Sequence, residues 1–210
     1  MKAGRFITVE GIEGVGKTTN LEFIENYLMQ HGVDVVVRTR EPGGTPLAED
    51  IRALLLQERA EEVDAVTELL LMFAARAQHV SSVIRPALAR GEWVLCDRFT
   101  DSSYAYQGGG RGIPEEQIQV LETLVLDDFE PDLTIILDLT VERALQRAEE
   151  RSAKDRFEQE ERLFFERVRQ DYLRRAERYP HRCHVVATTA ALEKVQQSLA
   201  KILDEHVLSD

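Results

Sequence analysis

The amino-acid sequence predicts an α/β fold in three layers, with a five-stranded parallel sheet flanked by helices. Five short apolar runs alternate with longer amphipathic stretches, which is typical of parallel strands joined by helices. A GxxxxGK[ST] motif separates the first apolar run from the first amphipathic stretch, where a strand would meet a helix. The 210 residues contain no internal repeat and no linker rich in Pro, Gly or Ser, so we expect residues 1–210 to form one domain.

The apolar runs are rich in β-branched and other apolar residues, as strands buried on both faces require. We expect strands at Phe6–Glu10, Val33–Thr39, Trp93–Asp97, Leu133–Leu139 and His184–Ala187.

The first helix is predicted over Thr18–His31, where Leu21, Ile24 and Leu28 recur at helical spacing and Gly32 follows as a C-terminal cap. We expect further helices at Pro46–Leu56, Asp64–Arg90, Glu115–Asp127, Val141–Arg151, Glu158–Tyr179 and Ala191–Val207. Between these, Gln107–Ile113 is predicted to be a glycine-rich loop, and Arg151–Phe157 breaks the helical pattern between two charged helices.

The charge distribution limits the possible partners. Hydrophobic residues make up 43% of the chain and charged residues 30%, as in ordinary soluble globular proteins, and the formal net charge is −12. An acidic surface repels polyanions, which argues against a general nucleic-acid coat protein. Between residues 143 and 178, however, basic residues outnumber acidic ones. A local cationic segment on an acidic protein suits a small polyanion.

The cysteines and the apolar segments predict a cytoplasmic location. Cys96 and Cys183 are far apart and belong to no CxxC or metal-spaced cluster, so we expect two reduced core thiols. The first residues lead directly into an apolar strand without a signal-like segment, and no apolar run approaches the ~20 residues of a membrane span.

The GxxxxGK[ST] motif predicts a phosphate-binding loop, or P-loop, and with it a P-loop NTPase fold. Such a loop lets backbone N–H groups converge on phosphate oxygens at the positive end of the following helix. We expect Lys17 to reach the β- and γ-phosphates of a nucleotide and the Thr18 hydroxyl to bind Mg²⁺. The residues predicted to bind ATP are Gly11, Ile12, Glu13, Gly14, Val15, Gly16, Lys17, Thr18 and Thr19.

The third predicted strand ends in Asp97 and Arg98. A carboxylate at this strand end would lie beside the P-loop, where it can hold Mg²⁺ or its water ligands. Arg98 would project from the carboxyl end of the sheet, where open α/β sheets bind ligands. The alternative is a solvent-exposed Asp–Arg pair without function.

One absent segment, the chain length and three segments that are present indicate which type of P-loop protein this is. It has no Asn-Lys-x-Asp segment, which guanine-specific switches normally carry, and its length suits a small-molecule kinase rather than a motor protein. The sequence resembles bacterial thymidylate kinases in three segments, in the same order and over almost the whole chain. They are REPGGT (residues 40–45), MFAARAQ (72–78) and DRFTDSSYAYQ with GGGRG (97–112). The resemblance implies transfer of the ATP γ-phosphate to thymidine monophosphate (dTMP), Mg²⁺ as cofactor, and a homodimer formed through apolar helix faces.

The resemblance also implies roles for residues around the acceptor. Glu13 would accept a hydrogen bond from the sugar 3′-hydroxyl, Arg98 would grip the monophosphate, and Tyr106 would exclude a ribose 2′-hydroxyl. Arg76 would bind a thymine carbonyl, Ser102, Ser103 and Gln107 would surround the acceptor, and Arg40 and Arg52 would lie near its phosphate. Met72 stands where the family commonly has Phe, so either Met72 or Phe73 would cover the face of the base.

A small helical lid is expected at about residues 143–157. The P-loop carries no arginine, so another segment must stabilise the charge on the transferring phosphate, and the resemblance is to members with a lid arginine. Arg151 is the first candidate and Arg147 the second; a solvated helix face is the alternative. Two other functions stay open: a kinase for another nucleotide or nucleoside, and a nucleotide-binding regulator that hydrolyses ATP slowly.

Overall fold

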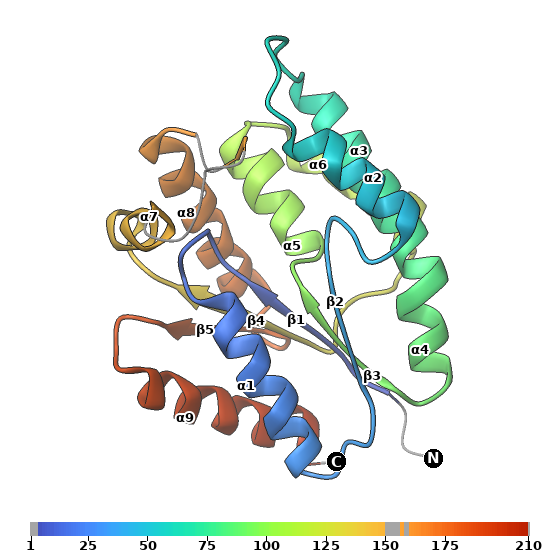
Figure 1. Cartoon of the computed structure of the whole chain (residues 1–210), viewed down its shortest axis with the longest axis vertical. Coiled ribbons are helices and arrows are strands. Elements are labelled where there is room, and N and C mark those ends of the chain that lie inside the picture. Colours follow the sequence, from blue (N-terminus) through green and yellow to red (C-terminus); the bar gives the residue numbers. More distant parts are fainter. Residues whose placement is uncertain (1–3, 150–155, 158–159, 210) are drawn as a thin grey trace.

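A computed structural model describes residues 4–149, 156–157 and 160–209 of the chain. Five parallel strands form one sheet in the order β2-β3-β1-β4-β5 (Figure 1). The strands are β1 (Phe6–Glu10), β2 (Val36–Arg40), β3 (Trp93–Asp97), β4 (Leu133–Asp138) and β5 (Cys183–Ala187). The five-stranded parallel sheet that the apolar runs predict is therefore confirmed. The observed β2 begins three residues later than expected, because residues 33–35 belong to the connection from the first helix.

Helices connect the strands and cover the sheet. Their bounds are α1 (Lys17–Gln30), α2 (Pro46–Leu56), α3 (Ala65–His79), α4 (Arg85–Ala89), α5 (Thr100–Ser103), α6 (Glu115–Leu126), α7 (Val141–Glu149), α8 (Arg162–Arg178) and α9 (Leu192–Leu203). The π-helical segment Val80–Ile84 joins α3 to α4, which gives the single long helix expected over this region. Among the described helices, none combines the length and apolar character needed to cross a bilayer.

The core lies on both faces of the sheet, because successive strand residues point to opposite sides. Ile7 and Leu95 pair across β1 and β3 and belong to the cluster that includes the buried residues of α1. Phe6 and Val94, one position earlier, pair with each other and pack instead with Ile84 and its neighbours. Helices α1 and α4 therefore cover opposite faces (Figure 1).

The prediction of a glycine-rich loop at Gln107–Ile113 is wrong over its first half, because Tyr104–Gly110 forms a π-helical extension of α5. The glycines allow close packing against α8 here. A Cβ on Gly110 would lie 2.4 Å from Phe164 Cε2. The guanidinium of Arg167 donates to the carbonyl oxygens of Gly109 and Gly110 at 3.2 and 2.8 Å.

Candidate active site

The P-loop connects β1 to α1 at the carboxyl end of the sheet. Gly11, Gly14 and Gly16 have φ angles of 131°, 76° and 95°, which residues other than glycine rarely adopt. Lys17 folds back over the loop, where its Nζ donates to the carbonyl oxygens of Gly11 and Ile12, each at 3.1 Å. Burial and the nearby Arg98 lower the pKa of Lys17 to about 8. The loop is thus a glycine-lined turn with a lysine at a helix N-terminus, where anions bind.

Helix α7 packs directly on this loop. A Cβ on Gly14 would lie 1.9 Å from the carbonyl oxygen of Ala144 in α7. No side chain, and so no arginine, fits at this position of the loop while α7 is in place.

Arg98 faces the P-loop from the end of β3. Its backbone has the unusual φ of 71°, and its guanidinium donates to Glu13 Oε1 at 2.8 Å. Two hydroxyl groups, those of Tyr106 and Tyr172, each lie 3.1 Å from the same guanidinium. Although burial raises the pKa of Glu13, Arg98 and Lys17 lower it below its ordinary value. Glu13 is therefore ionised and joins the two sides of the site.

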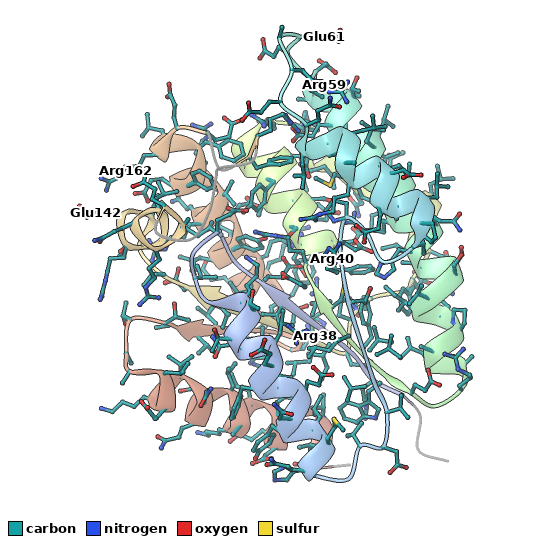
Figure 2. The ribbon with its side chains drawn as sticks, in the orientation of Figure 1. Arg38, Arg40, Arg59, Glu61, Glu142 and Arg162 are labelled. Atoms are coloured by element: carbon teal, nitrogen blue, oxygen red, sulfur yellow. The ribbon has the colours of Figure 1, made fainter. Side chains whose placement is uncertain are left out.

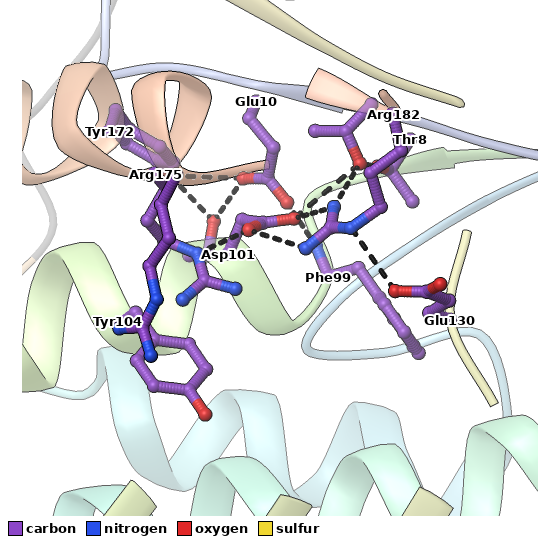
Figure 3. A network of polar contacts seen from close by, with 12 residues as sticks. Thr8, Glu10, Phe99, Asp101, Tyr104, Glu130, Tyr172, Arg175 and Arg182 are labelled. Carbon is purple, nitrogen blue, oxygen red and sulfur yellow. Dashed lines mark hydrogen bonds and ion pairs between the residues drawn. The ribbon is translucent and has the colours of Figure 1, made fainter. Parts of the chain in front are cut away.

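Beneath Arg98 lies a second carboxylate, Glu10, which is fully buried. It accepts hydrogen bonds from the backbone N–H of Phe99 at 2.7 Å, from Ser102 Oγ at 2.6 Å and from the Tyr172 hydroxyl at 3.0 Å (Figure 3). Burial, reinforced by the negative charge of Asp101, raises the pKa of Glu10 to about 7. These contacts fix the start of α5, immediately after Arg98.

Asp101 is the centre of a buried ionic cluster next to Glu10 (Figure 3). Arg175 from α8 and Arg182, which precedes β5, both donate to its carboxylate, with Arg182 Nη1 at 2.8 Å from Oδ2. Burial alone would raise the pKa of Asp101, but the two guanidinium groups lower it to about 2. The cluster ties α5 to the helix that follows the lid.

A cavity opens between the P-loop, α2, α3 and the start of α5. Nine residues expected from the sequence line it: Glu13, Arg52, Met72, Arg76, Arg98, Ser102, Ser103, Tyr106 and Gln107. Five others complete the lining: Glu41, Pro42, Leu56, Phe99 and Phe157.

Arg76 forms one wall of this cavity although it is almost fully buried. Its Nε donates to Glu41 Oε2 at 2.7 Å, and its Nη atoms donate to Ser103 Oγ and the carbonyl oxygen of Phe99, each at 3.0 Å. His79 Nδ1 lies 3.0 Å from the other oxygen of Glu41. The guanidinium is therefore held in one orientation. Its positive charge would be costly if buried without a partner, and Glu41 balances it.

A similar arrangement fixes Gln107 on the same side of the cavity. Its Nε2 donates at 2.9 Å to Oε1 of Glu68, a fully buried carboxylate on α3. Arg111 and Arg156 also donate to Glu68, and Arg156 additionally donates to the carbonyl oxygen of Leu55 at 2.8 Å. Arg156, which lies at the end of the expected lid, is thereby tied to α2 and α3.

The residues expected to hold Mg²⁺ fit such an ion. Asp97 Oδ1 is buried and has no hydrogen-bond partner within the described part of the chain, so it has a free lone pair for an ion or its water ligands. Thr18 lies exposed at the start of α1. Oxygen donors of these two kinds are what Mg²⁺ prefers.

The family model for thymidylate kinase matches residues 9–199. The chain belongs to the thymidylate kinase family. Thymidylate kinases of Teredinibacter turnerae and Pseudomonas syringae pv. tomato are 56% and 58% identical to it, over 96% of this chain and 98% and 96% of their own lengths. It is also similar to the crystal structure of thymidylate kinase from Ehrlichia chaffeensis, with a TM-score of 0.77, 39% identity and coverage of 96% of this chain and 99% of that one.

Membership of the thymidylate kinase family and the P-loop fold, both expected from the sequence, are confirmed. Two of the residues expected at the acceptor lie outside the cavity lining. Phe73 packs in a core cluster with Leu69 and Tyr104, under the Arg76 guanidinium, so Met72 is the residue of this pair that faces the cavity. Arg40, labelled in Figure 2, lies at the end of β2 and is half exposed. Its guanidinium pairs with Glu49 at 2.7 Å.

Of the two arginines predicted to act from the lid, only Arg147 lies in the described part of the chain. Arg147 is half-buried on α7, the helix that touches the P-loop. Arg151 lies outside the described residues.

Sequence reasoning missed the buried carboxylates Glu41 and Glu68, which orient the side chains facing this thymidylate kinase cavity. For Glu68 a signal existed, since it is an acidic residue within an otherwise apolar helical stretch. Tyr172 was missed because it comes from α8, 74 residues after Arg98 in the chain.

Proposed function

We propose that the chain transfers the γ-phosphoryl group of ATP to the 5′-phosphate of dTMP, giving ADP and thymidine diphosphate. One observation supports this proposal above all. A single cavity is lined by the P-loop carboxylate Glu13 and by Arg98, and also by the fixed polar groups Arg76, Ser103 and Gln107. An acceptor with an anionic phosphate and a hydrogen-bonding base matches these two kinds of group.

In the reaction, an oxygen of the acceptor phosphate forms a bond to the γ-phosphorus while the bond from that phosphorus to the β–γ bridging oxygen breaks. The attacking oxygen is already ionised, so no strong general base is needed. Catalysis then consists of alignment and charge stabilisation. Lys17 and the loop amides bind the transferred group, and Arg98 holds the acceptor phosphate in line. When bound, Mg²⁺ would neutralise phosphate charge, with Thr18 and Asp97 as its protein ligands.

Different residues of the acceptor site bind the sugar, the base and the phosphate of the nucleotide. Glu13 accepts a hydrogen bond from the 3′-hydroxyl, and Tyr106 lies where a 2′-hydroxyl would intrude. Arg76 donates to a carbonyl oxygen of the base, Gln107 and Ser103 meet its polar edge, and Met72 covers its face. Arg52 is close to the phosphate, whereas exposed Arg40 has a lesser role.

A lid arginine supplies the remaining positive charge. Because α7 blocks a side chain at Gly14, the P-loop has no room for an arginine at that position. The lid carries the candidates, with Arg151 as first choice and Arg147 as second. Closure of the lid also excludes water from the transferring group.

The test is ADP formation from ATP and Mg²⁺ with a panel of acceptors: dTMP, thymidine, and the monophosphates of deoxyuridine, deoxycytidine and adenosine. Strong turnover with dTMP is expected. Preference for another acceptor would contradict the proposed assignment of Arg76, Ser103, Tyr106 and Gln107. Hydrolysis of ATP without transfer to any acceptor would favour the regulator alternative.

We further propose a cytoplasmic homodimer. Exposed apolar side chains gather on two helices that pack together, Val66 and Leu70 on α3 and Val120 and Leu124 on α6. Cys96 and Cys183 are free and buried, which suits a reducing compartment. Sedimentation equilibrium should give twice the chain mass of 23.9 kDa, and a monomer would contradict the proposed dimer.

A further inference from the structure

The orientation of the Gln107 amide is fixed by a hydrogen bond to Glu68. Gln107 and Glu68 are 1% and 0% exposed, and Gln107 Nε2 donates to Glu68 Oε1 at 2.9 Å. Gln107 also lines the cavity. Within the described residues its Oε1 accepts no hydrogen bond. Since the two amide atoms diverge from one carbon, the nitrogen is committed to Glu68 and the oxygen is the atom available to a ligand.

The carboxylate of Glu68 is the acceptor in all of its hydrogen bonds within the described residues. Arg111 donates to both of its oxygens, at 3.3 and 3.2 Å, and Arg156 donates to Oε2 at 2.7 Å. A guanidinium has donors and no acceptor, so each of these contacts uses a Glu68 oxygen as the acceptor. If the Gln107 amide turned over, its oxygen would face Glu68 Oε1, and two buried acceptors would be brought together with no proton between them.

The fixed orientation distinguishes pyrimidines by the atom at position 3. Thymine and uracil carry an N3–H donor there, which an amide oxygen can accept. Cytosine has a bare N3 acceptor, which would be repelled by the same oxygen. A buried hydrogen-bonding site rejects an unmatched substrate strongly, because its own polar groups are left unpaired.

We propose that Glu68 is a specificity-determining positioning residue: it holds the oxygen of Gln107 toward the base, so that the site accepts pyrimidines with N3–H and rejects cytosine. The proposal rests on the proposed function, since it assigns the residue that orients a base-binding group of that same cavity.

The experiment compares deoxyuridine monophosphate (dUMP) with deoxycytidine monophosphate (dCMP) as acceptors for the wild-type enzyme and for Glu68→Gln. Both acceptors lack the thymine methyl group, so the ratio of their kcat/KM values reports only the polar edge. The amide introduced by this substitution can donate as well as accept, which permits both orientations of Gln107. The dUMP:dCMP ratio should therefore fall roughly 10-fold or more. A ratio within twofold of wild type would overturn the proposal.

Because both acceptors are measured on one preparation, the ratio is independent of the fraction of folded enzyme. If Glu68→Gln yields no active enzyme, Glu68→Ala serves as the second variant, with the same expected direction. Glu68→Asp still offers only acceptors and should keep a ratio near that of wild type; a fall equal to that of Glu68→Gln would contradict the proposal.

A Gln107→Met background separates positioning from a general structural effect. Without the amide there is no orientation to fix, so adding Glu68→Gln should leave the ratio unchanged. An equal fall in that background would show that the effect does not act through Gln107 and would overturn the proposal. Failure of the proposed function is distinguishable, because the wild-type enzyme would then not prefer dTMP in the acceptor panel.

Discussion

Glu13 in the P-loop and Arg98 at the end of β3 form an ion pair, with Oε1 and Nη2 2.8 Å apart. The Tyr106 hydroxyl donates to both oxygens of Glu13, at 2.8 and 2.7 Å, and lies 3.1 Å from Arg98. A carboxylate inside a phosphate-binding loop would by itself repel anionic ligands. Paired with Arg98, it instead connects the donor side of the site to the acceptor side and presents a charged acceptor at the cavity surface.

The first prediction concerns this carboxylate. The wild-type enzyme should prefer dTMP over 3′-deoxythymidine monophosphate, because only dTMP can donate its 3′-hydroxyl proton to Glu13. Hydrogen bonds to charged groups contribute about 1.5–3 kcal/mol, so the preference in kcat/KM should be roughly 10- to 100-fold. In Glu13→Ala the two acceptors should become nearly equal. A preference that survives this substitution would mean that another group binds the 3′-hydroxyl.

The second prediction concerns the lid. Arg151→Ala should lower kcat by roughly 10³-fold, the lower end of what an arginine contributes to phosphoryl transfer, while the KM for dTMP changes little. Arg143→Ala is the matched control, since Arg143 is exposed on α7 and should be nearly silent. Steady-state kinetics with dTMP varied at saturating ATP measures both quantities. Weaker dTMP binding with unchanged turnover would assign Arg151 to the acceptor site instead.

The sequence was informative wherever chemistry depends on local spacing. The P-loop, the strand end at Asp97 and Arg98, and the acceptor-side segments are contiguous in the chain, and most of the residues named from them line one cavity. The parallel sheet was equally predictable, because strands buried on both faces differ sharply in composition from the helices between them.

The sequence was less informative where contacts join distant segments. Glu41 lies 35 residues from Arg76, and Glu68 lies 88 residues from Arg156, so no local pattern reveals these pairs. The glycines at 108–110 show the same limit. Glycine permits both a flexible loop and close helix packing, and only the position of Phe164 in α8 decides between the two.

The third prediction concerns the buried ionic cluster of Figure 3. Asp101→Asn should destabilise the protein by about 3–5 kcal/mol, because the buried guanidinium groups of Arg175 and Arg182 lose their counter-charge. The control is Glu115→Gln, which breaks an ion pair with Arg178 whose side chains are both about half exposed. Its cost should be about 0–1 kcal/mol. Urea unfolding measures both values, and equal losses would contradict the structural role of Asp101.

The last prediction concerns Glu10 and pH. Its pKa rises from 4.5 in the unfolded chain to about 7 in the folded protein, chiefly through burial. Between these two values the folded protein holds a proton that the unfolded chain has released. The free energy of unfolding must therefore fall as pH rises through this window, with a contribution on the order of 3 kcal/mol. Below it, both states are protonated and this contribution to stability is fully present.

Glu10→Gln isolates that contribution, since the amide does not titrate and its oxygen can still accept from the Phe99 N–H. The difference in unfolding free energy, wild type minus variant, should be less favourable to the wild type at pH 7.5 than at pH 5, as measured by urea titration at each pH. Asp101, with a pKa of about 2, stays ionised throughout and is common to both proteins, so it cancels. A difference that does not change with pH would mean that Glu10 is already ionised at pH 5 in the folded protein, with its charge stabilised by Arg98 and the three hydrogen bonds that it accepts.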